Sequence, residues 1–485
     1  MAELDIWHRV TLEQEFGDRR RGGVRTLEDY LALEDRLFAE LDERVYRPVS
    51  ERGGAGDAGG GGGNLFNRYA RLSRSHPPSM PTDFNRTQVS IPPDGIDAAV
   101  GGALLVHGLS DSPYSMRTVA ELLHTRGYYV VNLRMPGHGT TPGSLDAARW
   151  HDWLAAVELG ARHVRQAVGD KPFMMVGYSN GGALMLKQTL DAIAQPTDPG
   201  TGEPRPVADK LFLISPALGV TRFAKAGAIH RWLTWHPYFE RFAWRSITPE
   251  YDPFKYNSFP KNAGKQIFDL TDQVRAKIKA VCAAGKADQI PSIVTHQSLV
   301  DSTVLIHKTL EFYDQLPDNG SELVIYDVNR ASYLQHFIDD RQTALLDGVR
   351  ERTDLPYRLT LIGNVSPDTL DTRKVTRGPG DAHETATPLD TPWPAEVYSL
   401  SHVALPFPPT DPLYGKGPDR CSPIRAEHLG DWPDLPIGSI ELRGERHLLS
   451  ILPADMIRLR HNPFFGELER GLLVELPREP PAPAG

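Results

Sequence analysis

Cysteine is scarce in this sequence, and this scarcity excludes whole classes of proteins. Only two cysteines, Cys282 and Cys421, occur in 485 residues. They can form at most one disulfide and lack the spacing of a metal-binding cluster, which excludes a disulfide-rich secreted domain and a cysteine-based zinc module. We expect both cysteines to be inert, and we expect a cytoplasmic location because this cysteine content suits a reducing compartment.

Long apolar runs and an excess of basic charge are also missing. No stretch approaches the roughly 18 apolar residues of a membrane span, and no basic start followed by an apolar core resembles a secretory signal. The 53 Lys and Arg residues are outnumbered by 62 Asp and Glu residues, which gives a formal net charge of −9. A face that binds nucleic acid needs the opposite balance. We therefore expect no membrane span and no nucleic-acid partner.

Glycine, in contrast, is plentiful, and it marks the most informative segment, MMVGYSNGGALML. The apolar run Phe173–Val176 is typical of a buried strand, and residues 183–193 carry apolar side chains at helical spacing. Between them lies Ser179, with Gly177 and Gly181 two positions to either side. Side chains at those two positions would collide with the strand and the helix. The Gly-x-Ser-x-Gly pattern therefore predicts a nucleophile elbow that presents a serine hydroxyl at the end of a sheet.

From residue 87 onward, strand-like runs alternate with helix-like runs. This alternation predicts the α/β fold class, with a mostly parallel sheet covered by helices on both faces, and ligands of such sheets bind at the carboxyl ends of the strands. The predicted strands are Thr87–Ile91, Ala103–Val106, Tyr128–Leu133, Phe173–Val176, Leu211–Ile214 and Ile293–Thr295, with further strand-like runs at Glu322–Tyr326 and Val397–Leu400.

Changes in composition divide the chain into parts. We predict an N-terminal helical extension (1–50), a Gly-rich flexible link (51–64), a core (65–217 and 291–465), an inserted cap (218–290) and a C-terminal tail (466–485). The cap is assigned from its dense aromatic residues, because the segment is too long for a simple connection. A second insertion, residues 366–394, is rich in Pro, Asp, Thr and Gly and is expected to be mobile.

The extension contains one clear helix signal. The segment from Thr26 to Asp29 resembles a capping box, and apolar residues then recur on one helical face to Leu41. Its polar face carries many acids and few lysines, which disfavours binding to a membrane surface. We expect this helix to dock on the main body of the protein.

A serine hydroxyl becomes a nucleophile only when a base removes its proton and an acid orients that base. Asp301 follows a predicted strand and is the candidate acid, although it could instead cap a helix that starts near Thr303. The base is either His402, which directly follows the strand-like run Val397–Leu400, or His336, which is nearer to the acid along the chain but lies in a helical pattern. Local chemistry favours His402, and His336 stays open.

The reaction also needs two backbone N–H groups for the negatively charged oxygen that forms on the substrate. The elbow supplies one from Asn180, the residue after the serine. We expect the other from Leu109, because Gly108 lets the chain approach closely after a predicted strand. His107 is expected to hold this loop through hydrogen bonds and to take no part in the chemistry.

Six motifs together resemble an α/β-hydrolase, close to bacterial proteins of the monoacylglycerol lipase and serine aminopeptidase type. They are LLVHGLSDSPYSM, LRMPGHGTTPGSL, MMVGYSNGGALML, FLISPA, QSLVDSTV and SLSHVALPFPPTDPLYG, and the likeness covers most of residues 80–465. The resemblance implies an α/β-hydrolase fold with Ser179 as nucleophile, Asp301 as acid and His402 as base. The extra strand-like segments between Asp301 and His402 and the long N-terminal extension depart from the pattern.

The expected function is a serine hydrolase that cleaves carboxylic esters through an acyl-enzyme, without a metal or organic cofactor. The cap aromatics suggest a small-molecule ester with an apolar acyl part, although they could equally form the core of the cap itself. An amidase or aminopeptidase, an acyltransferase and a non-catalytic binding protein remain as alternatives. The sequence gives no indication of the oligomeric state.

Overall fold

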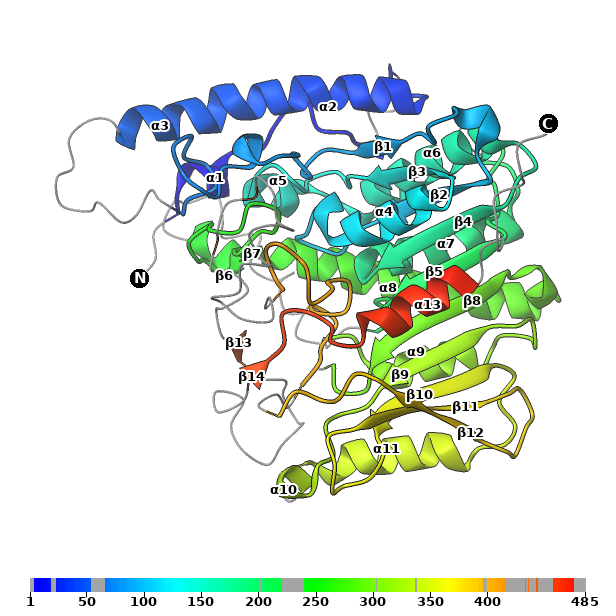
Figure 1. Cartoon of the computed structure of the whole chain (residues 1–485). Coiled ribbons are helices and arrows are strands. Elements are labelled where there is room, and N and C mark those ends of the chain that lie inside the picture. Colours follow the sequence, from blue (N-terminus) through cyan, green and yellow to red (C-terminus); the bar gives the residue numbers. More distant parts are fainter. Residues whose placement is uncertain are drawn as a thin grey trace.

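A single ten-stranded sheet forms the centre of the protein (Figure 1). The computed structural model describes residues 4–18, 23–53, 66–199, 202–219, 240–301, 303–335, 338–395, 399–415, 432, 435, 442–443 and 457–474. The strand order is β1-β3-β2-β4-β5-β8-β9-β10-β11-β12, and the strands from β3 to β10 in that order are parallel. Their bounds are Gln88–Ser90, Tyr128–Leu133, Gly101–Val106, Phe173–Tyr178, Lys210–Ile214, Ser292–Ser298, Glu322–Tyr326, Arg358–Asn364, Thr372–Arg377 and Thr385–Leu389, in the same order.

This sheet, with helices on both faces, confirms the predicted α/β fold class, and β1 to β5, β8 and β9 coincide with predicted strands. The sequence predicted no strand in residues 366–394, yet β11 and β12 lie within them and pair antiparallel at the edge of the sheet. The side chains of β12 are mostly exposed, so the strand has no alternating apolar pattern to reveal it. The run Val397–Leu400 lies partly outside the described residues, and Ser399 forms an isolated bridge with Arg458.

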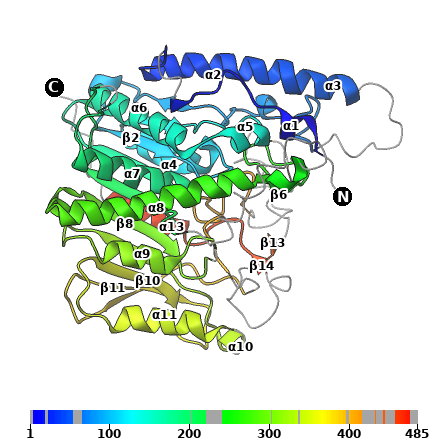
Figure 2. The same cartoon turned by 180° about the vertical axis from the view of Figure 1, so that it is seen from behind.

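Helices cover both faces of the sheet, and the side chains of each strand alternate between two hydrophobic cores. Leu104 packs into the core beneath the helices α6, α7, α8, α9 and α11, whereas Leu105 packs into the core beneath α4 and α13. The layer formed by α6, α7, α8, α9 and α11 faces the viewer in Figure 2. The bounds of the helices are Ile6–Arg9 (α1), Leu27–Leu41 (α2), Arg47–Gly53 (α3), Arg117–Thr125 (α4), Pro142–Ala147 (α5), Trp150–Val168 (α6), Asn180–Ala194 (α7), Lys261–Ala283 (α8), Ile306–Tyr313 (α9), Ser332–Gln335 (α10), Asp340–Glu351 (α11) and Phe465–Val474 (α13).

The predicted cap boundary, 218–290, needs correction. Helix α8 occupies most of the second half of that segment and packs against α6 and α7 in the helical layer. Its apolar stripe enters the same core as the sheet, through Ala263, Ile267, Leu270, Val274 and Ile278. In the described chain, the part of this segment that lies before α8 is residues 240–260, here called the cap segment or cap after the prediction, and it contains the small antiparallel pair β6 (Trp244–Ser246) and β7 (Phe259–Pro260).

Two further boundaries also shift. The predicted C-terminal tail, 466–485, begins inside α13, whose Leu468 and Leu472 are fully buried against the sheet. The predicted link, 51–64, begins inside α3, and the rest of it lies outside the described residues. Another small pair, β13 (Leu442–Arg443) and β14 (Ile457–Arg458), lies between the sheet and α13 in the chain.

Helix α2 of the N-terminal extension lies along the edge of the protein next to β1 (Figure 1). Its predicted capping box is present, with the N–H of Asp29 3.2 Å from the Thr26 hydroxyl and the N–H of Thr26 3.0 Å from the Asp29 carboxylate. Its apolar stripe is buried in two clusters, and one of them continues into the core of the sheet. The extension thus shares its hydrophobic core with the α/β body.

This shared core predicts a large difference between two leucine substitutions. Leu37→Ala should lower the free energy of unfolding by about 2–5 kcal/mol, because the side chain is fully buried in the cluster that the extension forms together with Tyr69. Leu72→Ala is the matched control, since Leu72 is 95 % exposed, and it should change stability by less than about 0.5 kcal/mol. Urea unfolding of the full chain measures both values, and equal effects would contradict the docked position of α2.

Candidate active site

Ser179 occupies a sharp turn between β4 and α7. Strand β4 ends at Tyr178, α7 begins at Asn180, and Ser179 has φ 51° and ψ −111°. A positive φ is unfavourable for a residue with a side chain and marks stored strain. The turn places Ser179, which is 8 % exposed, at the N-terminus of a helix and at the carboxyl edge of the sheet.

The two glycines beside the serine are required by close backbone contacts. A Cβ on Gly181 would lie 2.2 Å from the carbonyl oxygen of Val106, and a Cβ on Gly177 would lie 2.6 Å from the backbone of Gly182. Neither contact leaves room for any side chain. The sequence pattern and the local geometry therefore agree on a nucleophile-elbow conformation.

Asp301 and His402 are in direct contact, although 100 residues separate them in the sequence. The Nδ1 atom of His402 lies 2.5 Å from Oδ2 of Asp301, and the backbone N–H of His402 donates to the same oxygen at 2.8 Å. The other oxygen, Oδ1, accepts from the N–H groups of Thr303 and Val304 at 2.8 and 2.9 Å. The capping role and the orienting role proposed for Asp301 therefore coexist.

These partners determine the charge of Asp301. Burial of the carboxyl disfavours ionisation, but His402 and the backbone N–H groups outweigh burial and lower the pKa below its usual value. An ionised carboxylate on Nδ1 keeps the ring proton on that nitrogen. It leaves Nε2 of His402 as the nitrogen that can accept a proton.

Within the described residues, no hydrogen bond joins the Ser179 hydroxyl to His402. Asp111, in the loop after β2, interacts electrostatically with His402 and lies near Tyr178, the residue before Ser179. Burial raises the pKa of Asp111, whereas Lys255 and His402 oppose that rise. The Asp111 carboxylate also lies beside Gly108, together with the ring of Tyr178. The rival base, His336, lies outside the described residues.

The loop after β2 carries the predicted Leu109 N–H donor. His107 accepts a hydrogen bond at Nε2 from the N–H of Met135 at 3.1 Å, so its ring proton is on Nδ1, which donates to the carbonyl of Gly108 at 2.9 Å. That carbonyl and the N–H of Leu109 belong to one rigid peptide unit and point in opposite directions. By fixing the carbonyl, His107 fixes the direction of the N–H.

Neither predicted donor is used elsewhere in the described part of the chain. The N–H of Leu109 has no acceptor there. Asn180 is the first residue of α7, where an N–H has no acceptor within the helix. Both groups are therefore available to an external oxygen.

Sequence reasoning missed the contacts that hold this loop from the cap side. The N–H of Tyr256 donates to the carbonyl of Ser110 at 2.8 Å, and Lys255 forms an ion pair with Asp111 at 3.0 Å. Nothing in the sequence relates residues so far apart. A lysine and a tyrosine in the aromatic cap segment carry no pattern that points to the loop.

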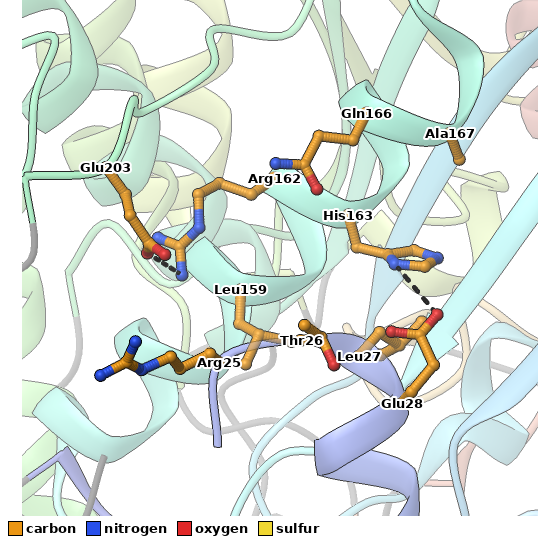
Figure 3. A pocket seen from close by; sticks show the side chains of 10 residues that line it. All are labelled: Arg25, Thr26, Leu27, Glu28, Leu159, Arg162, His163, Gln166, Ala167 and Glu203. Atoms are coloured by element: carbon orange, nitrogen blue, oxygen red, sulfur yellow. Dashed lines mark ion pairs between the residues drawn. The ribbon is translucent and has the colours of Figure 1, made fainter. Parts of the chain in front are cut away.

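Other possible sites give weaker indications. A pocket of about 410 Å³ lies between the start of α2 and α6, and its ion pairs join Glu28 to His163 and Glu203 to Arg162 (Figure 3). None of the proposed catalytic residues lines it. In the described ranges, no group of three His, Cys, Asp or Glu side chains is arranged to hold a metal ion.

Two remaining sequence predictions concern the cysteines and membrane spans. Cys282 is a free thiol, and Cys421 lies outside the described residues. None of the helices in the described chain combines the length and the hydropathy that crossing a bilayer requires.

Part of the sequence is similar to known proteins. Residues 103–342 match the profile described as "Alpha/beta hydrolase family". A stretch of 85 residues is 40 % identical to the thermostable monoacylglycerol lipase of Bacillus sp. (strain H-257), which corresponds to 18 % of this chain. The match spans only 33 % of the length of that relative.

Several solved structures superpose on about half of this chain. A metagenome-derived lipolytic enzyme superposes with a TM-score of 0.38 at 19 % identity, over 56 % of this chain and 99 % of that chain. The monoacylglycerol lipase of Paleococcus ferrophilus gives a TM-score of 0.33 at 17 % identity, over 50 % of this chain and 88 % of that chain.

The contact between Asp301 and His402 predicts a pH-dependent stability. Because the folded state lowers the pKa of Asp301, the contribution of the carboxylate is present above the unfolded pKa of about 3.9 and is lost as the pH falls through the folded value. Asp301→Asn should therefore lower the unfolding free energy more at pH 7 than at pH 3, by roughly 1.5–3 kcal/mol at pH 7. Urea unfolding at both pH values tests this, with the exposed Asp170→Asn as control. An effect that is no larger at pH 7 would contradict the pairing.

Proposed function

We propose that this chain, an α/β-hydrolase-fold protein similar to monoacylglycerol lipases, is a serine hydrolase that cleaves carboxylic esters through an acyl-enzyme. Ser179 is the nucleophile, His402 the base and Asp301 the acid. The observation that carries the proposal is the contact between Asp301 and His402, because two residues so distant in sequence meet at the sheet edge where Ser179 is held in a strained turn.

The proton path follows from the partners of each group. The Asp301 carboxylate holds the proton of His402 on Nδ1, so Nε2 takes the proton of the Ser179 hydroxyl as the oxygen attacks the ester carbonyl. His402 then gives that proton to the leaving alcohol. Water enters, His402 removes its proton, and the acid product leaves with Ser179 restored.

The N–H groups of Leu109 and Asn180 stabilise the oxygen that becomes negative during both steps. Each such donor contributes roughly 2.7–4 kcal/mol of transition-state stabilisation. The positive end of α7 adds to this effect, because Asn180 begins the helix. No metal or organic cofactor is needed for these steps.

The acidic side chains of the cap favour an ester substrate over a substrate with a free amine, because they are already bound to other groups. Each acid in residues 240–260 already has a partner. Glu240 pairs with Arg9, Glu250 accepts from two backbone N–H groups, and Asp252 accepts from two N–H groups and from the hydroxyl of Tyr414. A substrate ammonium group would have to displace one of these partners. This argues against an aminopeptidase.

An apolar acyl part is supported by one cluster of aromatic side chains. Tyr114, in the segment after the Leu109 loop, stacks on Phe254 of the cap with ring centroids 4.7 Å apart, and Phe407, which follows His402, joins the same cluster. These buried side chains form an apolar cluster between segments that flank the proposed catalytic residues. The substrate is accordingly a small-molecule ester with an apolar acyl chain, and a cytoplasmic location is proposed from the cysteine content alone.

Four proteins compared on a panel of substrates test the proposal: the wild type, Ser179→Ala, His402→Ala and His336→Ala. p-Nitrophenyl esters should be hydrolysed by the wild type faster than aminoacyl anilides. Ser179→Ala and His402→Ala should each lose at least about 10⁴-fold in kcat, since each removes a group that takes part in bond making or proton transfer. His336→Ala should retain activity. An inactive His336→Ala variant beside an active His402→Ala variant would show that the base is misassigned.

Two further measurements separate the alternatives. An alkyl phosphonate should label the wild type at Ser179 and leave Ser179→Ala unmodified, whereas failure to label folded wild type would favour a non-catalytic binding protein. Product analysis with and without an added alcohol distinguishes hydrolysis from acyl transfer. A product that is ester rather than acid in water with dilute alcohol would identify an acyltransferase.

A further inference from the structure

The N-terminal extension reaches a fully buried arginine beside the proposed active site. Arg134, in the loop after β3, is 0 % exposed. Its Nε lies 2.8 Å from Oε1 of Glu34, and its two terminal nitrogens lie 3.0 and 3.1 Å from the carboxylate oxygens of Glu15. Both carboxylates belong to the extension, so the charge of the arginine is balanced entirely from outside the α/β body.

The next peptide unit after Arg134 is part of the oxyanion loop's support. The N–H of Met135 is the donor to Nε2 of His107, which in turn holds the carbonyl of Gly108. Arg134 and Met135 share a peptide bond, so the position of Arg134 determines where that N–H points. A shift of the arginine would be passed through His107 to the N–H of Leu109.

The extension holds the same loop at two more places. The hydroxyl of Tyr30 donates to the carbonyl of Arg134 at 2.8 Å, and the N–H of Gly137 donates to Glu15 at 2.9 Å. The carbonyl of Arg134 and the N–H of Met135 belong to one peptide unit. That unit is therefore fixed from one side by Tyr30 and from the other by His107.

We propose that Glu15 and Glu34 of the extension are positioning residues for the oxyanion hole, acting through Arg134, Met135 and His107 on the N–H of Leu109. This inference rests on the proposed function of the same site. It assigns to the extension a part in catalysis, in addition to its packing on the sheet.

The test uses Glu15→Gln and Glu34→Gln in the full chain. Each change removes a charge that holds Arg134 and keeps the size of the side chain. The control is Asp42→Asn, because Asp42 also lies in the extension and also joins it to the body by an ion pair, with Arg71 at 2.5 Å, and neither Asp42 nor Arg71 belongs to the network. All variants are first compared with the wild type by thermal unfolding.

The first readout is the division of the effect between kcat and KM for a p-nitrophenyl ester. The oxyanion exists only in the transition state, so its misplacement should lower kcat and leave KM nearly unchanged. We expect a loss of roughly 10-fold in kcat for each variant, which is smaller than the loss of about 10²–10³-fold that follows removal of an oxyanion donor. KM should stay within about twofold.

The second readout is inhibition by butaneboronic acid. The Ser179 oxygen bonds to boron, the hydroxyl proton passes to His402, and the tetrahedral boronate places a negative oxygen in the oxyanion hole. The inhibition constant should rise by the same factor as kcat falls in Glu15→Gln and Glu34→Gln. It should be unchanged in Asp42→Asn, even if that variant unfolds at a lower temperature.

The outcomes separate the two proposals. If the wild type hydrolyses the ester and binds the boronic acid, but folded Glu15→Gln equals the wild type in kcat and inhibition, the positioning role is overturned. It is also overturned if Asp42→Asn loses as much kcat as the other two variants. If the wild type itself neither hydrolyses esters nor binds the boronic acid, the proposed function fails first. Should Glu34→Gln fail to fold, Glu15→Gln decides, because Glu15 lies at the rim of the cluster.

Discussion

The close approach of helix α7 to the carboxyl ends of β2 and β4 is the constraint on which the proposed site depends. With Gly181 facing the carbonyl of Val106, the first turn of the helix lies against the strand that leads into the Leu109 loop. The same turn contains Ser179 with its positive φ and the N–H of Asn180, which is one of the two proposed donors. Any side chain at position 181 would therefore disturb both the turn at Ser179 and the strand that leads into the Leu109 loop.

The two loops at this edge are held from outside the sheet on both sides. The cap binds the loop after β2 through Tyr256 and Lys255, and the extension binds the loop after β3 through Glu15 and Glu34. The cap also reaches the second loop, since the hydroxyl of Tyr256 donates to the carbonyl of Gly137 at 3.1 Å. A loop that carries catalytic N–H groups gains precision from such contacts, because its own backbone has few partners in the sheet.

Local pattern was sufficient to predict the central strands and the elbow. Apolar runs such as Tyr128–Leu133 are buried on both faces, and the glycines of the elbow are dictated by contacts within one strand–helix turn. Helix α8 was assigned to the cap because dense aromatic residues precede it in the same segment, although its apolar residues recur at helical spacing. The strand β12 was unpredictable for a different reason, since an exposed edge strand has no buried face to leave a pattern.

Long-range pairs depended on more than local pattern. Asp301 and His402 were linked by resemblance and by their places at strand ends, whereas the partners of Arg134 were not anticipated. One signal for them did exist. Glu34 occupies a position between Tyr30 and Leu37 on the apolar stripe of α2, and an acid at such a position is buried only when a charged partner meets it. The stripe shows that a partner is required, but only the fold shows that it is Arg134.

His402 and His107 lie in similar places, but the groups bound to their ring nitrogens differ and give the two side chains different chemistry. Both lie in loops at the carboxyl edge of the sheet. In His107 both nitrogens are occupied by backbone groups, and burial with the neighbouring His138 holds its pKa well below its usual range. It has no nitrogen left for a substrate proton. In His402 only Nδ1 is bound, and to a carboxylate, so the ring keeps one nitrogen for proton transfer. His107 is therefore suited to holding the loop in place, whereas His402 is available for the proton transfer proposed above.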